Sequence, residues 1–310
     1  MNKGMDLLSI HDLSADDVEE ILTLAADLKA KQKAGIPHPL LAGKTLGMIF
    51  EKSSTRTRVS FEVGMYQLGG QALFLSSRDL QLGRGEPIKD TARVLSRYLD
   101  GIMIRTYGHE RIEELARYAD IPVINALSDL LHPCQALTDL LTIREYKGKN
   151  LAGLKMAYVG DGNNMTHSLM YAAAKVGMHF AAATPEGYEA NAKVVANAKA
   201  DAAATGATVT ITHDPNEAVE GADVIVTDTW ASMGQEAEHD TRTAVFRPYQ
   251  VNRALVDAAD ARCIVMHCLP AYRGEEITEE VFEDFADVIF DEAENRLHVQ
   301  KAIMALVMGD

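Results

Sequence analysis

Disulfide-like cysteine pairs and long hydrophobic runs are missing from this 310-residue sequence. Its three cysteines, Cys134, Cys263 and Cys268, are an odd number without disulfide-like spacing, which indicates a reducing compartment. No run reaches the roughly 18 apolar residues of a membrane span, and the N-terminal residues lack the apolar core of a secretory signal. These features predict a soluble protein of the cytoplasm.

Positive charge is scarce as well. Asp and Glu number 45 against 30 Lys and Arg, for a formal net charge of -15. A chain of this charge has little general attraction for nucleic acid or for an anionic membrane surface, so we expect neither as a partner. The arginines Arg56 and Arg58 stand out against this background. A hydrophobic content of 47% with 24% charged residues is typical of a globular protein, and the length suits two domains.

Apolar strands alternate with helices along the whole chain, which predicts an α/β fold with mainly parallel sheets flanked by helices. A helix capped by Ser14 precedes the first strand. In the first half we expect strands at Thr45–Phe50, Ala72–Leu75, Ile102–Arg105 and Pro122–Asn125, with helices running to Leu68 and at Ile88–Leu99 and Arg111–Tyr118. In the second half we expect a helix at Ala190–Ala204 and strands at Lys155–Val159, His179–Ala183, Thr208–Thr212, Val224–Thr227, Ile264–Met266 and Val288–Phe290.

An amphipathic helix at about Gln135–Tyr146, followed by Lys147-Gly148-Lys149-Asn150, marks the expected domain boundary. We therefore assign a first domain to residues 1–148 and a second to residues 149–292. The last helix, at about 293–310, is a candidate for packing back on the first domain. Ligands of open α/β sheets bind beyond the carboxyl ends of the strands, so this organisation predicts an active site in a cleft between the two domains.

The segment Ser53–Arg58 lies between a strand and a helix, where free N–H groups and the helix dipole attract anions. Hydroxyls of Ser54, Thr55 and Thr57 add donors, and the guanidinium of Arg56 suits phosphate oxygens. The alternative is an ordinary helix cap with two solvated arginines. Because no Walker loop is present, the pattern favours a small phosphorylated substrate over a nucleotide.

Polar residues also follow two later strands of the first half. Arg105 ends an apolar strand, and its guanidinium is costly to desolvate unless an anion or carboxylate meets it. In His132-Pro133-Cys134-Gln135, the His132 ring could donate a hydrogen bond to a carbonyl oxygen, and Gln135 could bind an amide-like group. A purely structural histidine beside a proline is the alternative.

In the second half, Gly160-Asp161-Gly162-Asn163-Asn164 resembles part of a dinucleotide fingerprint but lacks its third glycine. Its asparagines suit a zwitterionic ligand instead. Asp228 could receive an ammonium group or form an Asx-turn. Cys268 is either an inert buried thiol or one polarised near the reaction.

No His-Glu-x-x-His or Cys-x-x-Cys spacing is present in the sequence, so we expect no metal site and no cofactor. Two other classes of function remain as alternatives at this point. A nicotinamide-dependent dehydrogenase would bind a dinucleotide tightly, and a noncatalytic binding protein would close on its ligand without turnover.

Taken together, the motifs resemble those of the ornithine carbamoyltransferases within the aspartate/ornithine carbamoyltransferase superfamily. The resemblance runs over nearly the whole chain and is carried, in order, by Ser54-Thr55-Arg56-Thr57-Arg58, Gly85-Glu86-Pro87-Ile88-Lys89-Asp90-Thr91, His132-Pro133-Cys134-Gln135, Asp228-Thr229-Trp230-Ala231-Ser232-Met233-Gly234 and His267-Cys268-Leu269-Pro270. It implies transfer of the carbamoyl group of carbamoyl phosphate to the side-chain amine of ornithine, giving citrulline and phosphate. Transfer to another amine, such as putrescine, is the alternative within the family.

The resemblance also implies the roles of individual residues. Carbamoyl phosphate would be held by Ser54, Thr55, Arg56, Thr57, Arg105, His132 and Gln135, with Cys268, Leu269 and Arg296 completing the site. Gln81 is similar to a residue that many members lend to this site from a neighbouring subunit. Ornithine would be bound by Asn164, Asp228, Ser232 and Met233, and the catalytic groups would be Arg105, His132, Cys268 and Asp228. The family further implies a homotrimer or a multiple of trimers, a cytoplasmic location and a place in arginine biosynthesis.

Overall fold

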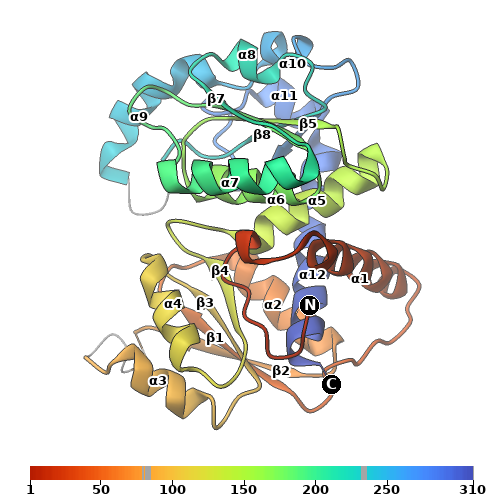
Figure 1. Ribbon diagram of the computed structural model, residues 1–310, viewed down its shortest axis with the longest axis vertical. Coiled ribbons are helices and arrows are strands. Elements are labelled where there is room, and N and C mark those ends of the chain that lie inside the picture. Colours follow the sequence, from red (N-terminus) through yellow and green to blue (C-terminus); the bar gives the residue numbers. More distant parts are fainter. Residues whose placement is uncertain (79, 81–84, 232–235, 310) are drawn as a thin grey trace. The chain divides into compact units, whose positions relative to one another are not determined.

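The computed structural model describes residues 1–78, 80, 85–231 and 236–309, which form two compact units. Unit 1 comprises Met1–Leu137 and Asn295–Asp310, and unit 2 comprises Thr138–Glu294. Each unit holds its own parallel sheet, coloured red to yellow in unit 1 and green to blue in unit 2 (Figure 1). The expected two-part α/β fold with parallel sheets is thus confirmed. The units divide within a helix, at Leu137, whereas the sequence places the domain boundary after residue 148.

Unit 1 contains a four-stranded sheet in the order β2-β1-β3-β4, with every neighbouring pair parallel. Its strands are β1 (Thr45–Phe50), β2 (Gln71–Ser76), β3 (Gly101–Arg105) and β4 (Val123–Leu127). Its helices are α1 (Ala15–Lys33), α2 (Thr55–Gln67), α3 (Ile88–Leu95) and α4 (His109–Tyr118), preceded by a short turn of 3-10 helix, η1 (Ile10–Asp12). Two further helices, α5 (Pro133–Lys147) and α12 (Ala286–Met308), contribute residues to both units.

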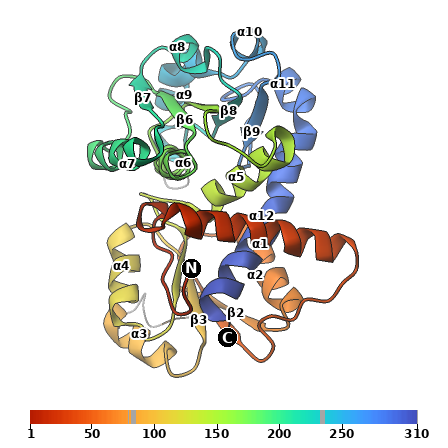
Figure 2. The ribbon, with the colours of Figure 1, turned by 45° about the vertical axis from the view of Figure 1, so that its right-hand side comes forward.

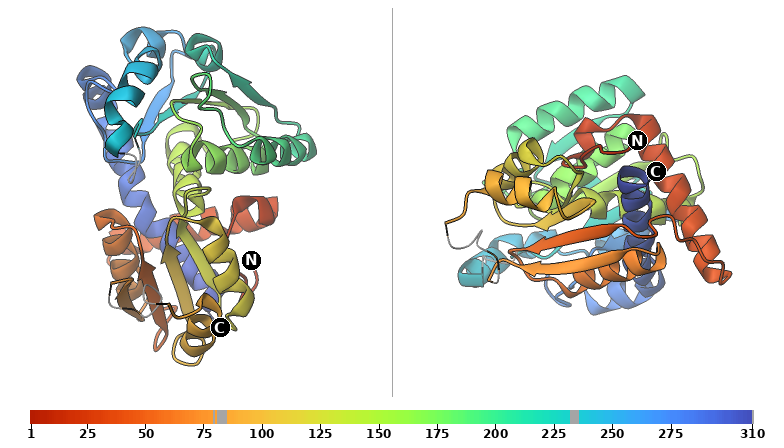
Figure 3. Two further views of the ribbon diagram at one scale, coloured as in Figure 1. Left: turned by 90° about the vertical axis from the view of Figure 1, so that its left-hand side faces the viewer. Right: turned by 90° about the horizontal axis from the view of Figure 1, so that it is seen from below.

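Local sequence explains how these elements begin and pack. Ser14 caps α1 as predicted: its hydroxyl accepts from the Asp17 N–H at 3.1 Å, and the Asp17 carboxylate accepts from the Ser14 N–H at 2.9 Å. In the sheet, β3 is buried along its whole length, whereas the edge strand β2 is partly exposed. The two chain ends meet beside the sheet, where the Gly4 N–H donates to the Val307 carbonyl at 2.9 Å (Figure 3).

Unit 2 contains a five-stranded parallel sheet in the order β7-β6-β5-β8-β9. The strands are β5 (Lys155–Val159), β6 (His179–Ala183), β7 (Val209–Thr212), β8 (Val224–Thr227) and β9 (Ile264–His267). The helices are α6 (Asn164–Lys175), α7 (Ala192–Thr205), α8 (Pro215–Val219), α9 (His239–Phe246), α10 (Arg253–Asp257) and α11 (Glu279–Asp284), with 3-10 turns η3 (Glu236–Glu238) and η4 (Arg247–Tyr249). Figure 2 shows α6 and α7 side by side along this sheet.

One predicted strand is wrong. Residues Val288–Phe290 lie inside α12, which begins at Ala286 rather than near Ala293. Val288 and Ile289 are buried while Phe290 is 56% exposed, as expected for successive positions around a helix. A run of three apolar residues carries too little periodicity to separate a strand from one face of a helix. The structure also ends α3 at Leu95, four residues before the predicted end.

Both sheets contain a point at which the chain reverses its direction of winding. In unit 1 the chain moves from β1 outward to β2, and later from β3 outward to β4. In unit 2 it moves from β5 through β6 to β7, and later from β8 to β9. Ligands of open parallel sheets bind where the loops diverge at such switch points. The fold therefore directs attention to the loops after β1 and β3 in unit 1, and after β5 and β8 in unit 2.

Candidate active site

At the switch point of unit 1, the end of β1 leads into the N-terminus of α2. Ser54 is the N-cap of this 13-residue helix, and its hydroxyl accepts from the Thr57 N–H at 3.2 Å. Thr55 and Arg56 therefore occupy the first turn, where the helix dipole favours an anion. The Arg296 guanidinium donates to the Thr57 hydroxyl at 2.8 Å and brings a second cation to this turn.

The loop after β3 and the start of α5 add further buried polar groups to unit 1. Arg105 ends β3 and is 8% exposed, while His132 is 5% exposed and Gln135 is fully buried. Burial lowers the pKa of His132 well below its usual value, and the cations of Arg296 and Arg105 lower that pKa further. The imidazole is therefore neutral near pH 7, so one ring nitrogen carries a proton that it can donate.

Two residues that the sequence analysis missed also lie at this edge. Lys52 is 5% exposed, forms an ion pair with Asp129 and sits 4.4 Å from the centre of the Tyr107 ring. Glu51 accepts from the Arg111 guanidinium at 2.6 Å and also from the Thr106 hydroxyl. Lys52 extends the cationic character of the edge, and its place between an apolar strand and the hydroxyl-rich run is the signal that could have identified it.

The adjacent Cys134 has a structural role. Its thiol donates to the Asn125 carbonyl at 3.5 Å, and burial raises its pKa to about 12, against the opposing charge of Arg296. Such a thiol does not ionise near neutral pH, so Cys134 packs the site without offering a nucleophile.

In unit 2, Asp228 follows β8 and Asn163 follows β5, on the two sides of the switch point. The Asn163 amide donates to one Asp228 oxygen at 3.2 Å, and the Thr229 N–H donates to the other at 2.8 Å. Asn163 also caps α6 through its side-chain oxygen, which accepts from the Met165 N–H at 2.9 Å. Asn164 is the first residue of that helix. Asn163 thus helps to fix the Asp228 carboxylate, a role the sequence analysis did not assign.

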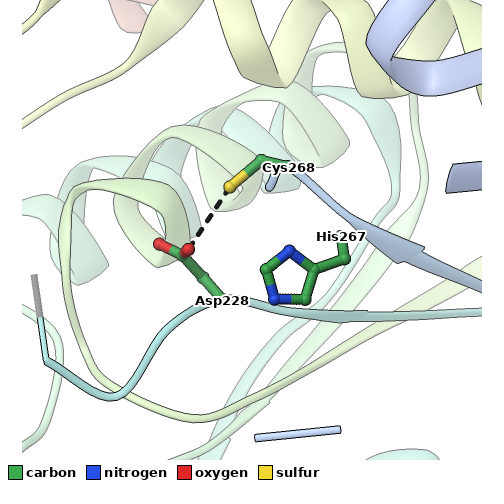
Figure 4. Close-up of side chains that lie close together, drawn as sticks. All are labelled: Asp228, His267 and Cys268. Carbon is green, nitrogen blue, oxygen red and sulfur yellow. Dashed lines mark hydrogen bonds between the residues drawn. The ribbon is translucent and has the colours of Figure 1, made fainter. Parts of the chain in front are cut away.

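Cys268, directly after β9, points toward the same carboxylate, as Figure 4 shows. Its thiol donates to Asp228 Oδ1 at 3.3 Å. Burial raises the pKa of Cys268 well above its usual value, and the negative charges of Asp228, Glu292 and Asp139 raise it further. Cys268 is therefore a protonated hydrogen-bond donor rather than a thiolate.

The residue before it, His267, is fully buried and holds this turn in place. Its Nε2 lies 3.0 Å from Glu276 Oε1, and its Nδ1 accepts from the Leu269 N–H at 2.9 Å. The ring is therefore a single tautomer with its proton on Nε2. Leu269 has a φ of 59°, a left-handed conformation that costs a residue with a side chain. Strained backbone of this kind is held by surrounding contacts and is found preferentially at functional sites.

Asp228, His267 and Cys268 could in principle ligate a metal ion, because one donor atom of each lies within 4.8 Å of the others. Both His267 nitrogens are already engaged by Glu276 and the Leu269 N–H, and the Cys268 thiol is protonated. A metal would have to displace this network and release a proton. The expectation that the site works without a metal stays a prediction.

Nearly the whole chain also matches known protein domains. Residues 5–145 match the carbamoyl-phosphate-binding domain of aspartate/ornithine carbamoyltransferases, and residues 152–307 match the Asp/Orn-binding domain of the same family. The chain belongs to the aspartate/ornithine carbamoyltransferase family. The resemblance inferred from the sequence motifs is confirmed.

Relatives of this carbamoyltransferase include the ornithine carbamoyltransferase of Carboxydothermus hydrogenoformans, which is 62% identical over 99% of this chain and 98% of its own. The ornithine carbamoyltransferase of Anoxybacillus flavithermus is 61% identical over 99% and 97% of the two chains. The solved structure of ornithine carbamoyltransferase from Pyrococcus furiosus superposes with a TM-score of 0.95 at 57% identity, covering 99% of this chain and 97% of the other.

Most of the predicted site residues of this carbamoyltransferase lie in unit 1 or unit 2, and three lie outside the residues that the structure describes. Unit 1 holds Ser54, Thr55, Arg56, Thr57, Arg105, His132, Gln135 and Arg296, and unit 2 holds Asn164, Asp228, Cys268 and Leu269. Gln81, Ser232 and Met233 lie outside the described residues. Within unit 1 the structure joins Arg296 to Thr57 and places Arg296 and Arg105 near His132; within unit 2 it joins Cys268 to Asp228.

Proposed function

We propose that this enzyme transfers the carbamoyl group of carbamoyl phosphate to the side-chain amine of L-ornithine, giving L-citrulline and phosphate. The observation that carries the proposal is the contrast between the two switch points. Cations and a neutral histidine gather at a helix N-terminus in unit 1, whereas a carboxylate held by an asparagine and a thiol lies in unit 2. The first suits a phosphate and its attached carbonyl, and the second suits an ammonium group.

Carbamoyl phosphate would be bound by the first turn of α2 and the cations around it. The proposed ligands are Ser54, Thr55, Arg56, Thr57, Gln81, Arg105, His132, Gln135, Cys268, Leu269 and Arg296. The guanidinium groups of Arg56 and Arg105 neutralise the phosphate as it leaves, and the neutral His132 ring donates to the carbonyl oxygen as negative charge develops there. A histidine kept neutral by burial and by its cationic neighbours can donate this hydrogen bond without itself carrying a charge.

Ornithine would be bound by Asn164, Asp228, Ser232 and Met233. Its reactive amine has a pKa near that of lysine, about 10.4 in water, and must lose a proton before it can attack. Nitrogen then bonds to the carbonyl carbon, the bond from that carbon to the phosphate oxygen breaks, and phosphate leaves with the proton that the attacking nitrogen gives up. Because its raised pKa keeps Cys268 protonated, that thiol is not available to accept the proton.

The deciding measurement is kcat/KM for ornithine, putrescine, lysine and N-acetylornithine at one pH and saturating carbamoyl phosphate. Putrescine carries the same reactive amine without the α-carboxylate, so a zwitterion site would be left with two or three unpaired polar groups. At about 1–3 kcal/mol each, this should separate ornithine from putrescine by about a thousandfold. Putrescine turnover within about tenfold of ornithine would instead assign the enzyme to transfer onto that amine.

We further propose that the enzyme is a homotrimer, or a multiple of trimers, of the cytoplasm that acts in arginine biosynthesis. On the side of edge strand β2 where Arg58 of α2 covers the Phe74 ring, Phe74 is partly exposed, and α2 exposes Val59, Val63 and Tyr66, which gives unit 1 an apolar surface suited to another copy. The three cysteines are thiols, as suits a reducing compartment. A relative from Pyrococcus furiosus, 58% identical, is named an anabolic ornithine carbamoyltransferase.

Subunit mixing tests both the assembly and the place of Gln81. A Gln81→Ala variant and an Arg105→Ala variant, each inactive alone, would be dissociated together and reassembled, with mass measured by light scattering. If Gln81 completes a neighbouring subunit's site, mixed assemblies contain some intact sites and regain part of the activity. Well-mixed trimers without any recovery would place Gln81 in its own subunit's site, and a monomer in solution would refute the trimer.

A further inference from the structure

The loops that follow β5 and β8 in unit 2 are joined by one buried arginine from a different element. Arg242 lies on α9 and is 4% exposed. Its Nη2 donates to the Asp161 carboxylate, in the loop after β5, and its Nε donates to the Trp230 carbonyl, in the loop after β8. A third guanidinium nitrogen, Nη1, lies 3.7 Å from Glu238. One planar fork therefore holds two loops at a fixed separation.

Aromatic rings fix the position of the guanidinium. Its central carbon lies 4.9 Å from the centre of the Tyr188 ring and 5.1 Å from that of Phe246. Trp230 stacks on Phe246 with ring centres 6.1 Å apart, and Tyr188 meets Phe246 edge-on at 4.9 Å. Since Trp230 and Phe246 are almost fully buried, this cluster leaves the guanidinium little room to move.

The loop after β5 is held on its other side as well. The Asp161 carbonyl accepts from the Thr166 hydroxyl at 2.6 Å, and the Gly162 N–H donates to the Tyr188 carbonyl at 2.9 Å. A Cβ at position 162 would lie 2.3 Å from backbone atoms of the neighbouring segment, so only glycine allows this close approach. The loop therefore has one well-defined conformation, and Arg242 relates that conformation to the loop after β8.

These two loops carry the proposed ornithine ligands: Asn164 begins α6 directly after the first loop, and Asp228 begins the second. We infer that Arg242 is a positioning residue for ornithine recognition, which sets the separation of Asn164 and Asp228 through its links to Asp161 and Trp230. The inference rests on the proposed ornithine site and adds to it a residue that itself touches no substrate. The Asn163–Asp228 hydrogen bond is a second link between the same loops, so loss of Arg242 should loosen the site without abolishing it.

The test separates positioning from simple stabilisation of the fold. Arg242→Met keeps the packing against the rings but leaves the Asp161 carboxylate buried without its cation, so its melting temperature should fall. Adding Asp161→Asn removes that uncompensated charge, so the double variant should recover most of the loss. If Arg242 positions the loops, the double variant should still have an ornithine KM raised about tenfold or more, with a carbamoyl phosphate Kd within about twofold of the parent.

Further variants complete the design. Arg242→Lys can reach only one of the two loops at a time, so its ornithine KM should fall between those of the parent and Arg242→Met. Asp161→Asn alone weakens one link and should raise KM severalfold. Arg253→Gln is the matched control, because Arg253 lies in unit 2 and forms ion pairs with Glu280 and Asp284 at the surface; its KM should not change.

A folded double variant with an ornithine KM within about twofold of the parent would reduce Arg242 to a structural role. If the double variant does not fold, an unchanged KM in both Arg242→Lys and Asp161→Asn would refute the inference equally well. The underlying ornithine site is tested separately with Asp228→Asn. An unchanged ornithine KM in that variant would overturn the site assignment, whatever the Arg242 variants do.

Discussion

The two units of this carbamoyltransferase place polar groups at the same position in their sheets, but the charges of those groups are opposite. In each, polar groups lie where a parallel sheet changes its direction of winding. Unit 1 places Arg56, Arg105 and Arg296 there, with a histidine that burial and the charges of Arg296 and Arg105 keep neutral, whereas unit 2 places Asp228 beside a thiol that stays protonated. The sheet thus determines where a site can form, and the few residues after each strand determine which charge it will bind.

We expect the largest loss of activity when the cation at the start of α2 is removed. Arg56→Ala should lower kcat/KM by at least about 100-fold, because a charge-assisted hydrogen bond is worth about 1.5–3 kcal/mol and the fork makes two. Arg56→Lys should recover little of this, since an ammonium cannot reproduce the fork. Steady-state kinetics check both, with Arg93→Ala, a surface arginine beside Tyr118, as the control. A lysine variant near parental activity would remove Arg56 from the phosphate site.

A somewhat smaller effect is expected in unit 2. Asp228→Asn keeps the shape of the side chain but removes the charge that attracts an ammonium group. We expect kcat/KM for ornithine to fall by about 10- to 100-fold, while the carbamoyl phosphate Kd measured by calorimetry stays near the parental value. Equal damage to both substrates would show that the two switch points do not divide the substrates between them.

A milder change is expected for Cys268→Ser. The serine hydroxyl can still donate to Asp228, and displacement of phosphate by an amine requires no enzyme nucleophile. Turnover should stay within about tenfold of the parent, with the change seen mainly in the ornithine KM. Trapping a carbamoyl-cysteine that forms and decays at the turnover rate would contradict this role for the thiol.

The smallest effect concerns stability rather than activity. Lys301 in α12 is fully buried and donates to Gln67 at 2.8 Å and to Gln32 at 3.1 Å, and burial lowers its pKa from 10.5 to about 8. Between pH 8 and 10.5 the unfolded chain therefore binds more protons at this lysine than the folded protein does, so its contribution to stability rises with pH.

Chemical unfolding at several pH values measures this contribution. The free energy of unfolding of the parent, minus that of Lys301→Met, should grow as pH is raised from 8 to 10.5. The surface variant Lys31→Met, which loses only an ion pair with Asp27, should show no such trend. A constant difference for Lys301→Met would mean that this lysine keeps its ordinary pKa in the folded protein.

Regular elements and strand-end residues could be predicted from the sequence, because both are local patterns. The strands at Thr45–Phe50 and Lys155–Val159 are bounded as predicted, since each is a compact apolar run between polar residues. The motifs that follow strands identified Arg105 and Asp228. What could not be predicted depends on contacts between distant segments. In the sequence, nothing distinguishes Arg242 from other arginines in helices. Only the folded chain brings it to Asp161 and Trp230.

The left-handed backbone at Leu269 affects which residues can replace this leucine. That conformation costs a residue with a side chain about 1–2 kcal/mol, which glycine would avoid. The leucine side chain, however, packs against the core cluster of unit 2, and glycine would lose that contact. Because the backbone cost of leucine and the contact that glycine loses oppose each other, a library sorted only for folded protein should admit glycine and asparagine at this position. A library sorted for turnover should return to leucine, since Leu269 is a proposed ligand of carbamoyl phosphate.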